Sequence, residues 1–188
     1  MTGALRRAVF LDRDGTLNRA VIRDGKPYPP STLAELEVFP DAPAALAALK
    51  AADFLLIVVT NQPDVARRIR SREEIEVLNA ALRAMLPLDD VFTCCHDDSD
   101  HCGCRKPLPG LLVQAAAKHG IDLGASFMVG DFWRDVEAGR RAGCRTVFVD
   151  RGYPDAAPPG RPDHTVQSLA AAAEWILGET EGTTDERR

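Results

Sequence analysis

Short apolar segments recur along this chain, and segments with helical spacing separate them. Each apolar segment is bounded by polar or turn-forming residues, a pattern typical of buried strands. These segments lie at residues 8–11, 54–59, 91–93, 126–130 and 144–149, and residues 164–166 are expected to add a last short strand. Strands that alternate with helices predict an α/β fold, a doubly wound, mostly parallel sheet with helices on both faces.

The segments between these strands carry helix signals. Ser71 followed three residues later by Glu74 predicts a capping box at the start of one helix. Asp41 is expected to cap another helix. The predicted helices lie at residues 41–52, 71–85, 109–119, 134–142 and 168–177. Residues 18–40 are rich in turn signals and predict a long loop, of the kind that is usually functional or mobile.

Length and charge limit what the protein can do. A chain of 188 residues is long enough for one domain with a real core, which we expect over residues 1–178, with a flexible tail at 179–188. The net charge of −5 and the scattered basic residues argue against nucleic acid as a partner. No apolar run approaches the ~20 residues needed to span a bilayer, and no signal peptide is recognised. We therefore expect a monomeric, cytoplasmic protein with no membrane partner.

Polar side chains follow three of the predicted strands. Asp12 and Asp14 follow the first strand, Thr60 and Asn61 follow the second, and Asp131 follows the strand at 126–130. The carboxyl ends of parallel strands meet at one edge of a sheet, so these groups can converge. Taken alone, the two neighbouring carboxylates fit either a Mg²⁺ site or a solvated turn. The polar residues at the other two strand ends, Asp131 among them, favour the Mg²⁺ site over the solvated turn.

These side chains supply the parts that phosphoryl transfer needs. Asp12 can attack phosphorus as a nucleophile, and Asp14 can act as the acid and base. Thr60 can donate a hydrogen bond to a phosphate oxygen, and Lys106 brings a positive charge. Asp131 can complete an oxygen-rich Mg²⁺ site, because Mg²⁺ prefers hard oxygen ligands.

The chain resembles, in order, the four motifs of the haloacid-dehalogenase-like phosphatases. The matching segments are 12–16 (DRDGT), 60–62 (TNQ), 105–107 (RKP) and 130–131 (GD) with Asp135. The resemblance implies that Asp12, the backbone carbonyl of Asp14, and Asp131 bind Mg²⁺. It also implies that Asn61 and Arg105 contact the phosphate or the sugar. Asp135 lies one helical turn after Asp131 and is expected to support the metal site without binding the metal.

Four of the five cysteines lie close together, at residues 94–104. Their spacing suits one tetrahedral Zn²⁺ on a short loop. The expected ligands are Cys94, His96, Cys102 and Cys104. Cys95 in place of Cys94, or His101 in place of His96, stays open, as do free structural cysteines. With four protein ligands the zinc would be structural, and we expect it to aim Arg105 and Lys106 at the substrate.

The cysteine spacing narrows the resemblance to the histidinol-phosphatase-like branch of the family. That branch implies no large cap domain and a small phosphorylated metabolite as substrate, a heptose bisphosphate first and histidinol phosphate second. Phe132 stands where a small, polar or basic residue is expected, so the exact substrate stays open. A phosphotransferase and a non-catalytic zinc-loop binding protein are the rival functions. Asp97, Asp98 and Asp100 are expected to be solvated.

Overall fold

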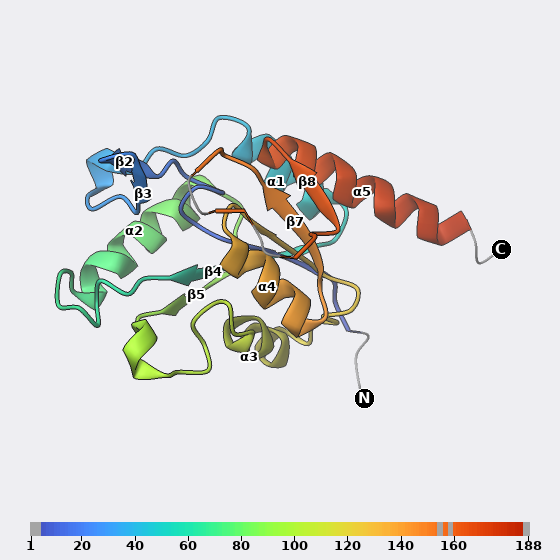
Figure 1. Ribbon diagram of the computed structural model, residues 1–188. Helices are drawn as coiled ribbons and strands as arrows, with labels where there is room; N and C mark the ends of the chain where they lie inside the picture. Colours follow the sequence, from blue (N-terminus) through green and yellow to red (C-terminus); the bar gives the residue numbers. More distant parts are fainter. Residues whose placement is uncertain (1–4, 154–155, 158–159, 186–188) are drawn as a thin grey trace.

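A six-stranded sheet forms the centre of the computed structural model, which describes residues 5–153, 156–157 and 160–185 (Figure 1). Its strands are β1 (Ala8–Leu11), β4 (Leu55–Asn61), β5 (Asp90–Cys94), β6 (Phe127–Gly130), β7 (Arg145–Val149) and β8 (His164–Val166). Their spatial order is β5-β4-β1-β6-β7-β8, and every neighbouring pair is parallel. The six strands predicted from the apolar segments are confirmed.

Helices cover both faces of the sheet (Figure 1). In the part of the chain that the structure describes they are α1 (Ala42–Ala51), α2 (Arg72–Met85), α3 (Gly110–His119), α4 (Trp133–Ala142) and α5 (Leu169–Asp185). One face packs against α1, α5 and the end of α2, and the opposite face packs against α3 and α4. The doubly wound α/β fold is therefore confirmed, and no large cap domain is present among the described residues.

The central strand β1 shows why its sequence is apolar without interruption. Val9 and Leu11 belong to the core under α1 and α5, whereas Ala8 and Phe10 belong to the core on the other face. All four side chains are fully buried. Successive side chains of a strand point to opposite faces, so a strand covered on both faces needs apolar residues at every position.

The segment predicted as a long loop contains a small antiparallel hairpin. Its strands are β2 (Val21–Arg23) and β3 (Lys26–Tyr28), and a short 3-10 helix, η1 (Leu33–Glu35), follows. Asp24 and Gly25 form the turn with positive φ angles of 49° and 73°, the backbone that a two-residue hairpin loop requires. The hairpin brings Tyr28 to the carboxyl-terminal edge of the main sheet, where it lines the main cavity.

Two details at the helix ends differ from the predictions. Asp41 precedes α1 but does not cap it, since its Oδ2 instead accepts the amide N–H of Ala170 at the start of α5, at 3.0 Å. The carboxylate therefore ties two helices of one face together. The last helix also continues to Asp185, beyond the predicted end at 177, while residues 186–188 of the predicted tail lie outside the described residues.

The strand order creates a topological switch beside β1. From β1 the chain builds one half of the sheet with β4 and β5, and then returns to pair β6 with the other side of β1. In open α/β sheets, ligand sites lie at such a switch, outside the carboxyl ends of the strands. Among the described residues, no helix combines the length and apolar character needed to cross a bilayer.

Candidate active site

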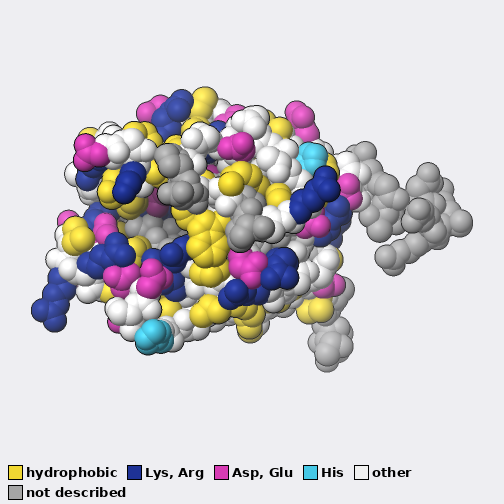
Figure 2. Space-filling model, in the orientation of Figure 1, with side chains coloured by type: hydrophobic (Ala, Val, Ile, Leu, Met, Phe, Trp, Pro, Cys, Tyr) yellow, Lys and Arg dark blue, Asp and Glu magenta, His cyan; other side chains and the backbone are white. Residues whose placement is uncertain are grey.

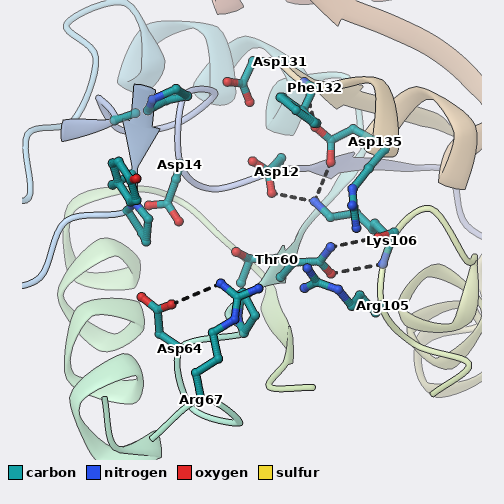
Figure 3. A pocket seen from close by; sticks show the side chains of 17 residues that line it. Asp12, Asp14, Thr60, Asp64, Arg67, Arg105, Lys106, Asp131, Phe132 and Asp135 are labelled. Atoms are coloured by element: carbon teal, nitrogen blue, oxygen red, sulfur yellow. Dashed lines mark hydrogen bonds and ion pairs between the residues drawn. The ribbon is translucent and has the colours of Figure 1, made fainter. Parts of the chain in front are cut away.

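A cavity of about 480 Å³ opens at the carboxyl ends of β1, β4 and β6 (Figure 3). It collects the polar residues predicted at these strand ends together with residues of the hairpin and of α4. The lining residues that carry the argument are Asp12, Asp14, Thr60, Asn61, Arg105, Lys106, Asp131 and Asp135. The convergence predicted from separate strand ends is thus observed in the structure.

Lys106 is the buried cation at the floor of the cavity. Its Nζ lies 2.5 Å from Oδ1 of Asp12 and 2.6 Å from Oδ1 of Asp135, and it donates to the carbonyl of Val59 at 2.7 Å. Only 2% of the residue is exposed. Burial by itself would lower the pKa of this ammonium, but the two carboxylates raise it, so Lys106 is charged. Figure 3 shows Lys106 directed at Asp12 and Asp135.

Three carboxylates surround the same point. Oxygens of Asp12, Asp131 and Asp135 all lie within 4.8 Å of one another. Burial, followed by the repulsion of Asp135 and Asp14, raises the pKa of Asp12 to about 7 despite the attraction of Lys106. The pKa of Asp131 is also raised, by burial and by Asp12 and Asp135. A crowded set of buried hard oxygens is suited to a divalent cation such as Mg²⁺, which relieves this repulsion.

The turn after β1 is shaped to admit Asp131. Gly15 has a φ of 91°, and a Cβ at this position would lie 2.0 Å from Oδ2 of Asp131. No other residue type fits there without moving the carboxylate. The hydroxyl of Thr16 donates to Oδ1 of Asp131 at 3.3 Å. The DRDGT segment therefore holds Asp131 in place in addition to carrying Asp12 and Asp14.

Asp14 points away from the cluster of three carboxylates. Its oxygens accept hydrogen bonds from Arg13, from Asn18 at 3.0 Å and from Gln62 at 2.8 Å. Burial would raise the pKa of Asp14, but the charge and hydrogen bonds of the fully buried Arg13 lower it, with help from Asn18 and Gln62. The Asp14 carboxylate is thus held ionised in the chain without substrate, and both its role as acid and base and its backbone carbonyl as a Mg²⁺ ligand stay predictions.

The two residues at the end of β4 have different surroundings. Thr60 is buried and reaches the cavity, as a donor to a phosphate oxygen would. Asn61 also lines the cavity, but its side-chain amide is engaged by the backbone of Lys106. Its Nδ2 donates to the carbonyl of Lys106 and its Oδ1 accepts the amide of Lys106, both at 3.0 Å. The direct contact of Asn61 with phosphate or sugar stays a prediction, and its observed contact fixes the lysine segment.

The predicted zinc ligands come together at the end of β5. Ligand atoms of Cys94, His96, Cys102 and Cys104 all lie within 4.8 Å of one another. The Sγ atom of Cys94 is 3.8 Å from that of Cys102 and 3.3 Å from that of Cys104. A tetrahedron with Zn–S bonds of about 2.3 Å has sulfur–sulfur edges of roughly 3.8 Å, so the donor set and its spacing fit Zn²⁺. Of the described residues, neither Cys95 nor His101 joins this group.

Three arginines form the rim of the cavity. Two aspartates hold them, and both belong to the loop with the candidate zinc ligands (residues 94–104, the zinc loop). Arg67 donates to Asp97 at 2.7 Å, whereas Arg105 and Arg134 both donate to Oδ1 of Asp98, at 2.7 and 3.0 Å. The hydrogen bonds from Arg105 and Arg134 lower the pKa of Asp98 to about 2. Asp98 and Asp100 are exposed, as predicted, whereas Asp97 is partly buried. The prediction did not include the ion pairs that Asp97 and Asp98 form with arginines. On this side of the molecule, acidic and basic side chains gather next to each other (Figure 2).

Sequence reasoning missed three residues of this site. Arg67 and Arg134 carried no motif, and their partner aspartates lie 30 and 36 residues away in the chain. Gln62 was part of the TNQ segment but received no role. Its buried side chain donates to Asp14 at 2.8 Å and to Thr60 at 2.9 Å. The position of Gln62 two residues after Thr60, on the same side of an extended chain, is the signal that could have found it.

Comparison with known proteins agrees with this site. Residues 103–172 match a family model described as "HAD-hyrolase-like". The D-glycero-D-manno-heptose-1,7-bisphosphate 7-phosphatase of Thermosynechococcus vestitus is 34% identical, with 91% of this chain and 95% of that protein covered. The D-glycero-beta-D-manno-heptose-1,7-bisphosphate 7-phosphatase of Bordetella bronchiseptica is 32% identical, with 92% and 99% covered.

The fold is similar to that of a solved structure, which is also named as a heptose bisphosphate phosphatase. The D,D-heptose 1.7-bisphosphate phosphatase from B. bronchiseptica, complexed with magnesium and phosphate, superposes with a TM-score of 0.74. The two sequences are 30% identical, and the match covers 92% of this chain and 99% of that one. Sequence and fold therefore lead to the same group of proteins over nearly the full length of both chains.

Proposed function

The chain belongs to the haloacid-dehalogenase-like phosphatases, and from this premise we propose that Asp12 is its nucleophile and a sugar bisphosphate its substrate. The observation that supports the nucleophile is the place of Asp12 between Lys106, at 2.5 Å, and the other two carboxylates. Asp12 follows β1, whereas Lys106 lies in the segment before α3, so their contact is a product of the fold. Asp12, the backbone carbonyl of Asp14, and Asp131 are our candidates to hold Mg²⁺, which would neutralise the phosphate charge. Asp135 would support the site through its ion pair with Lys106.

The proposed reaction has two steps. A carboxylate oxygen of Asp12 attacks phosphorus while the bond from phosphorus to the alcohol oxygen breaks. Asp14, which takes up a proton when the substrate binds, delivers that proton to the departing alcohol. Asp14 then takes a proton from water as that water attacks the aspartyl-phosphate. Inorganic phosphate leaves and the carboxylate of Asp12 is restored. Thr60 donates a hydrogen bond to a phosphate oxygen in both steps, and the positive charge of Lys106 stabilises the negative charge of the phosphate.

The arginine rim supports a substrate with a second phosphate. Arg67, Arg105 and Arg134 line the cavity, and each forms an ion pair with a partly exposed carboxylate of the zinc loop. Guanidinium groups bind phosphate with strong, charge-assisted hydrogen bonds. Histidinol phosphate carries an amine cation in place of a second phosphate, so the rim favours a bisphosphate. The names of the relatives support a heptose 1,7-bisphosphate in particular.

We also propose a structural role for zinc and a reducing environment for the protein. The four ligands form a closed site, which leaves no position for substrate. None of the five cysteines forms a disulfide, as is usual in a reducing compartment such as the cytoplasm. Zinc would hold Asp97 and Asp98 at the rim and Arg105 beside the cavity.

A hydrolysis screen tests the proposed function. Purified protein is offered heptose and hexose bisphosphates, sugar monophosphates, histidinol phosphate and nucleotides, with Mg²⁺ or with a chelator. We expect Mg²⁺-dependent release of inorganic phosphate, fastest from a sugar bisphosphate, and none from Asp12→Asn. Preference for histidinol phosphate would replace the substrate assignment. Transfer to an added alcohol faster than hydrolysis would indicate a phosphotransferase, and absence of turnover would indicate a binding protein.

A further inference from the structure

Gln62 joins two residues of the proposed reaction although it does not line the cavity. It follows the last residue of β4, and its amide N–H donates to the carbonyl of Cys94 at 2.7 Å. This bond continues the pairing of β4 with β5 by one residue and fixes the direction of the side chain. Only 1% of Gln62 is exposed. The side chain therefore has one defined environment between β1 and β4.

The side-chain amide of Gln62 uses both of its hydrogens. Nε2 donates to Oδ2 of Asp14 at 2.8 Å and to Oγ1 of Thr60 at 2.9 Å. A side-chain NH₂ group has two hydrogens, and an ionised carboxylate can only accept, so the NH₂ group must face Asp14. The opposite atom, Oε1, is buried without a hydrogen-bond partner. The orientation that directs both hydrogens of the amide to Asp14 and Thr60 therefore leaves Oε1 without a partner.

The contact with Thr60 decides where the hydroxyl hydrogen of Thr60 points. A hydroxyl has one hydrogen to donate and lone pairs with which to accept. Because Oγ1 of Thr60 accepts from Gln62, its own hydrogen is left for another acceptor. Thr60 lines the cavity beside Asp12 and Lys106 (Figure 3), so that acceptor is a phosphate oxygen of the substrate.

We propose that Gln62 is a positioning residue that aligns the hydroxyl of Thr60 with the phosphate and holds the carboxylate of Asp14 beside the departing alcohol. This inference rests on the proposed phosphatase reaction. Arg13 and Asn18 also bind Asp14, but both approach it from the β1 turn, whereas Gln62 comes from β4. Gln62 is therefore the link that sets Asp14 and Thr60 relative to each other.

The test uses two substrates that differ in their need for an acid. A sugar alkoxide needs a proton in order to leave, whereas p-nitrophenolate leaves without one. We expect Gln62→Leu to lower kcat for the best sugar bisphosphate by about 100-fold, since general acid catalysis is worth about 10²–10⁴. The same variant should lower kcat for p-nitrophenyl phosphate by only about 10-fold, the value of one lost hydrogen bond at Thr60. A purely structural defect would lower both rates equally and would overturn the proposal.

A second comparison isolates the effect on Thr60. If Gln62 acts on p-nitrophenyl phosphate only through Thr60, then Gln62→Leu should cost less than about twofold in a Thr60→Val background. Full additivity of the two substitutions would overturn this part of the proposal. Thr146→Val is the matched control, since it removes a buried hydrogen bond to Asp163 remote from the cavity and should leave the ratio of the two rates unchanged.

A second variant serves if Gln62→Leu does not fold, and the activity of the wild type separates failure of this inference from failure of the proposed function. If Gln62→Leu does not give a cooperative thermal transition, Gln62→Asn replaces it, because a shorter amide cannot reach both partners. Equal losses of the two rates in Gln62→Asn would again overturn the proposal. A wild-type protein that hydrolyses no phosphate monoester would instead refute the proposed function. An active wild type with an unchanged rate ratio in the variant refutes only the role of Gln62.

Discussion

The side-chain amide of Asn61 and the backbone of Lys106 form a reciprocal pair of hydrogen bonds, each 3.0 Å long. The amide pairs with both backbone polar atoms of one residue, as a residue of a neighbouring strand can. Lys106 lies in a segment between the zinc loop and α3 that belongs to no strand or helix. Its buried ammonium is nevertheless fixed against Asp12, because β4 holds its backbone through Asn61.

The first prediction follows from this pair. Asn61→Leu keeps the side-chain size but removes both hydrogen bonds, so the Lys106 segment loses its attachment to β4. We expect kcat/KM for the best bisphosphate to fall about 10–100-fold, the equivalent of one or two buried hydrogen bonds. Steady-state kinetics measure the loss. Ser126→Ala removes a buried hydrogen bond to the amide of Ala8 outside the cavity, and it should leave kcat/KM within about twofold.

The second prediction concerns pH and Mg²⁺. Burial and the neighbouring carboxylates raise the pKa of Asp12 from 3.8 to about 7 in the metal-free chain. Between these values the folded chain keeps a proton that the unfolded chain releases, so metal-free stability falls as pH rises through this window. Mg²⁺ binds the deprotonated carboxylate. We therefore expect Mg²⁺ to raise the melting temperature much more at pH 8 than at pH 5.

Thermal melts with and without Mg²⁺ across this range measure the effect. In Asp12→Asn the side chain cannot titrate, so the pH dependence of the Mg²⁺ effect should become clearly smaller. Some dependence should remain, because burial also raises the pKa of Asp131. A Mg²⁺ effect of equal size at pH 5 and pH 8 in the wild type would contradict this assignment of the metal site.

The third prediction concerns zinc. Metal analysis of protein purified without added zinc should find about one zinc per chain. The double substitution Cys102→Ser with Cys104→Ser should abolish binding and reduce both thermal stability and turnover of the bisphosphate. Cys95→Ala and Cys144→Ser serve as controls and should keep the zinc, because neither residue belongs to the four-ligand group. The zinc site would be excluded if the wild-type protein contained no zinc and the double variant kept its thermal stability and turnover.

The fourth prediction separates recognition from chemistry. Arg67→Ala and Arg134→Ala should each raise KM for the sugar bisphosphate by about 10-fold or more, the value of a charge-assisted hydrogen bond. Neither should change kcat for p-nitrophenyl phosphate by more than about twofold, because that substrate has no second phosphate. Arg140→Ala is the matched control, since Arg140 pairs with Glu137 on α4 and does not line the cavity. Equal losses with both substrates would argue against a second-phosphate site.

The parts predicted from sequence have local signals. Strands and helices of the main fold follow from apolar runs and from the capping box of Ser71 and Glu74, which the structure contains. The acidic strand ends were recognisable because each follows its strand directly, and parallel strands must end at one edge. The zinc ligands lie within one short loop, so their spacing alone indicated the cluster.

The parts that were not predicted depend on partners far away in the chain. Asp41 has the sequence position of a cap for α1, but its hydrogen-bond partner lies 129 residues later. The acidic residues of the zinc loop read as solvated because Arg67 and Arg134 belong to other segments. The strands of the hairpin have only three residues each, too few for an alternating pattern to stand out. Contacts between side chains that are far apart in the sequence leave no periodic pattern in either local segment, so the sequence alone does not reveal them.

The zinc loop is held at both of its ends by two neighbouring residues, Asn61 at the end of β4 and Gln62 directly after it. Gln62 binds the carbonyl of Cys94 where the loop begins, and Asn61 binds the backbone of Lys106 where it ends. Between these two anchors, changes of length or sequence can be absorbed without moving the lysine. A designer can therefore graft loops of other lengths between residues 96 and 102 to change which leaving group is accepted, while the machinery that cleaves the phosphate stays where it is.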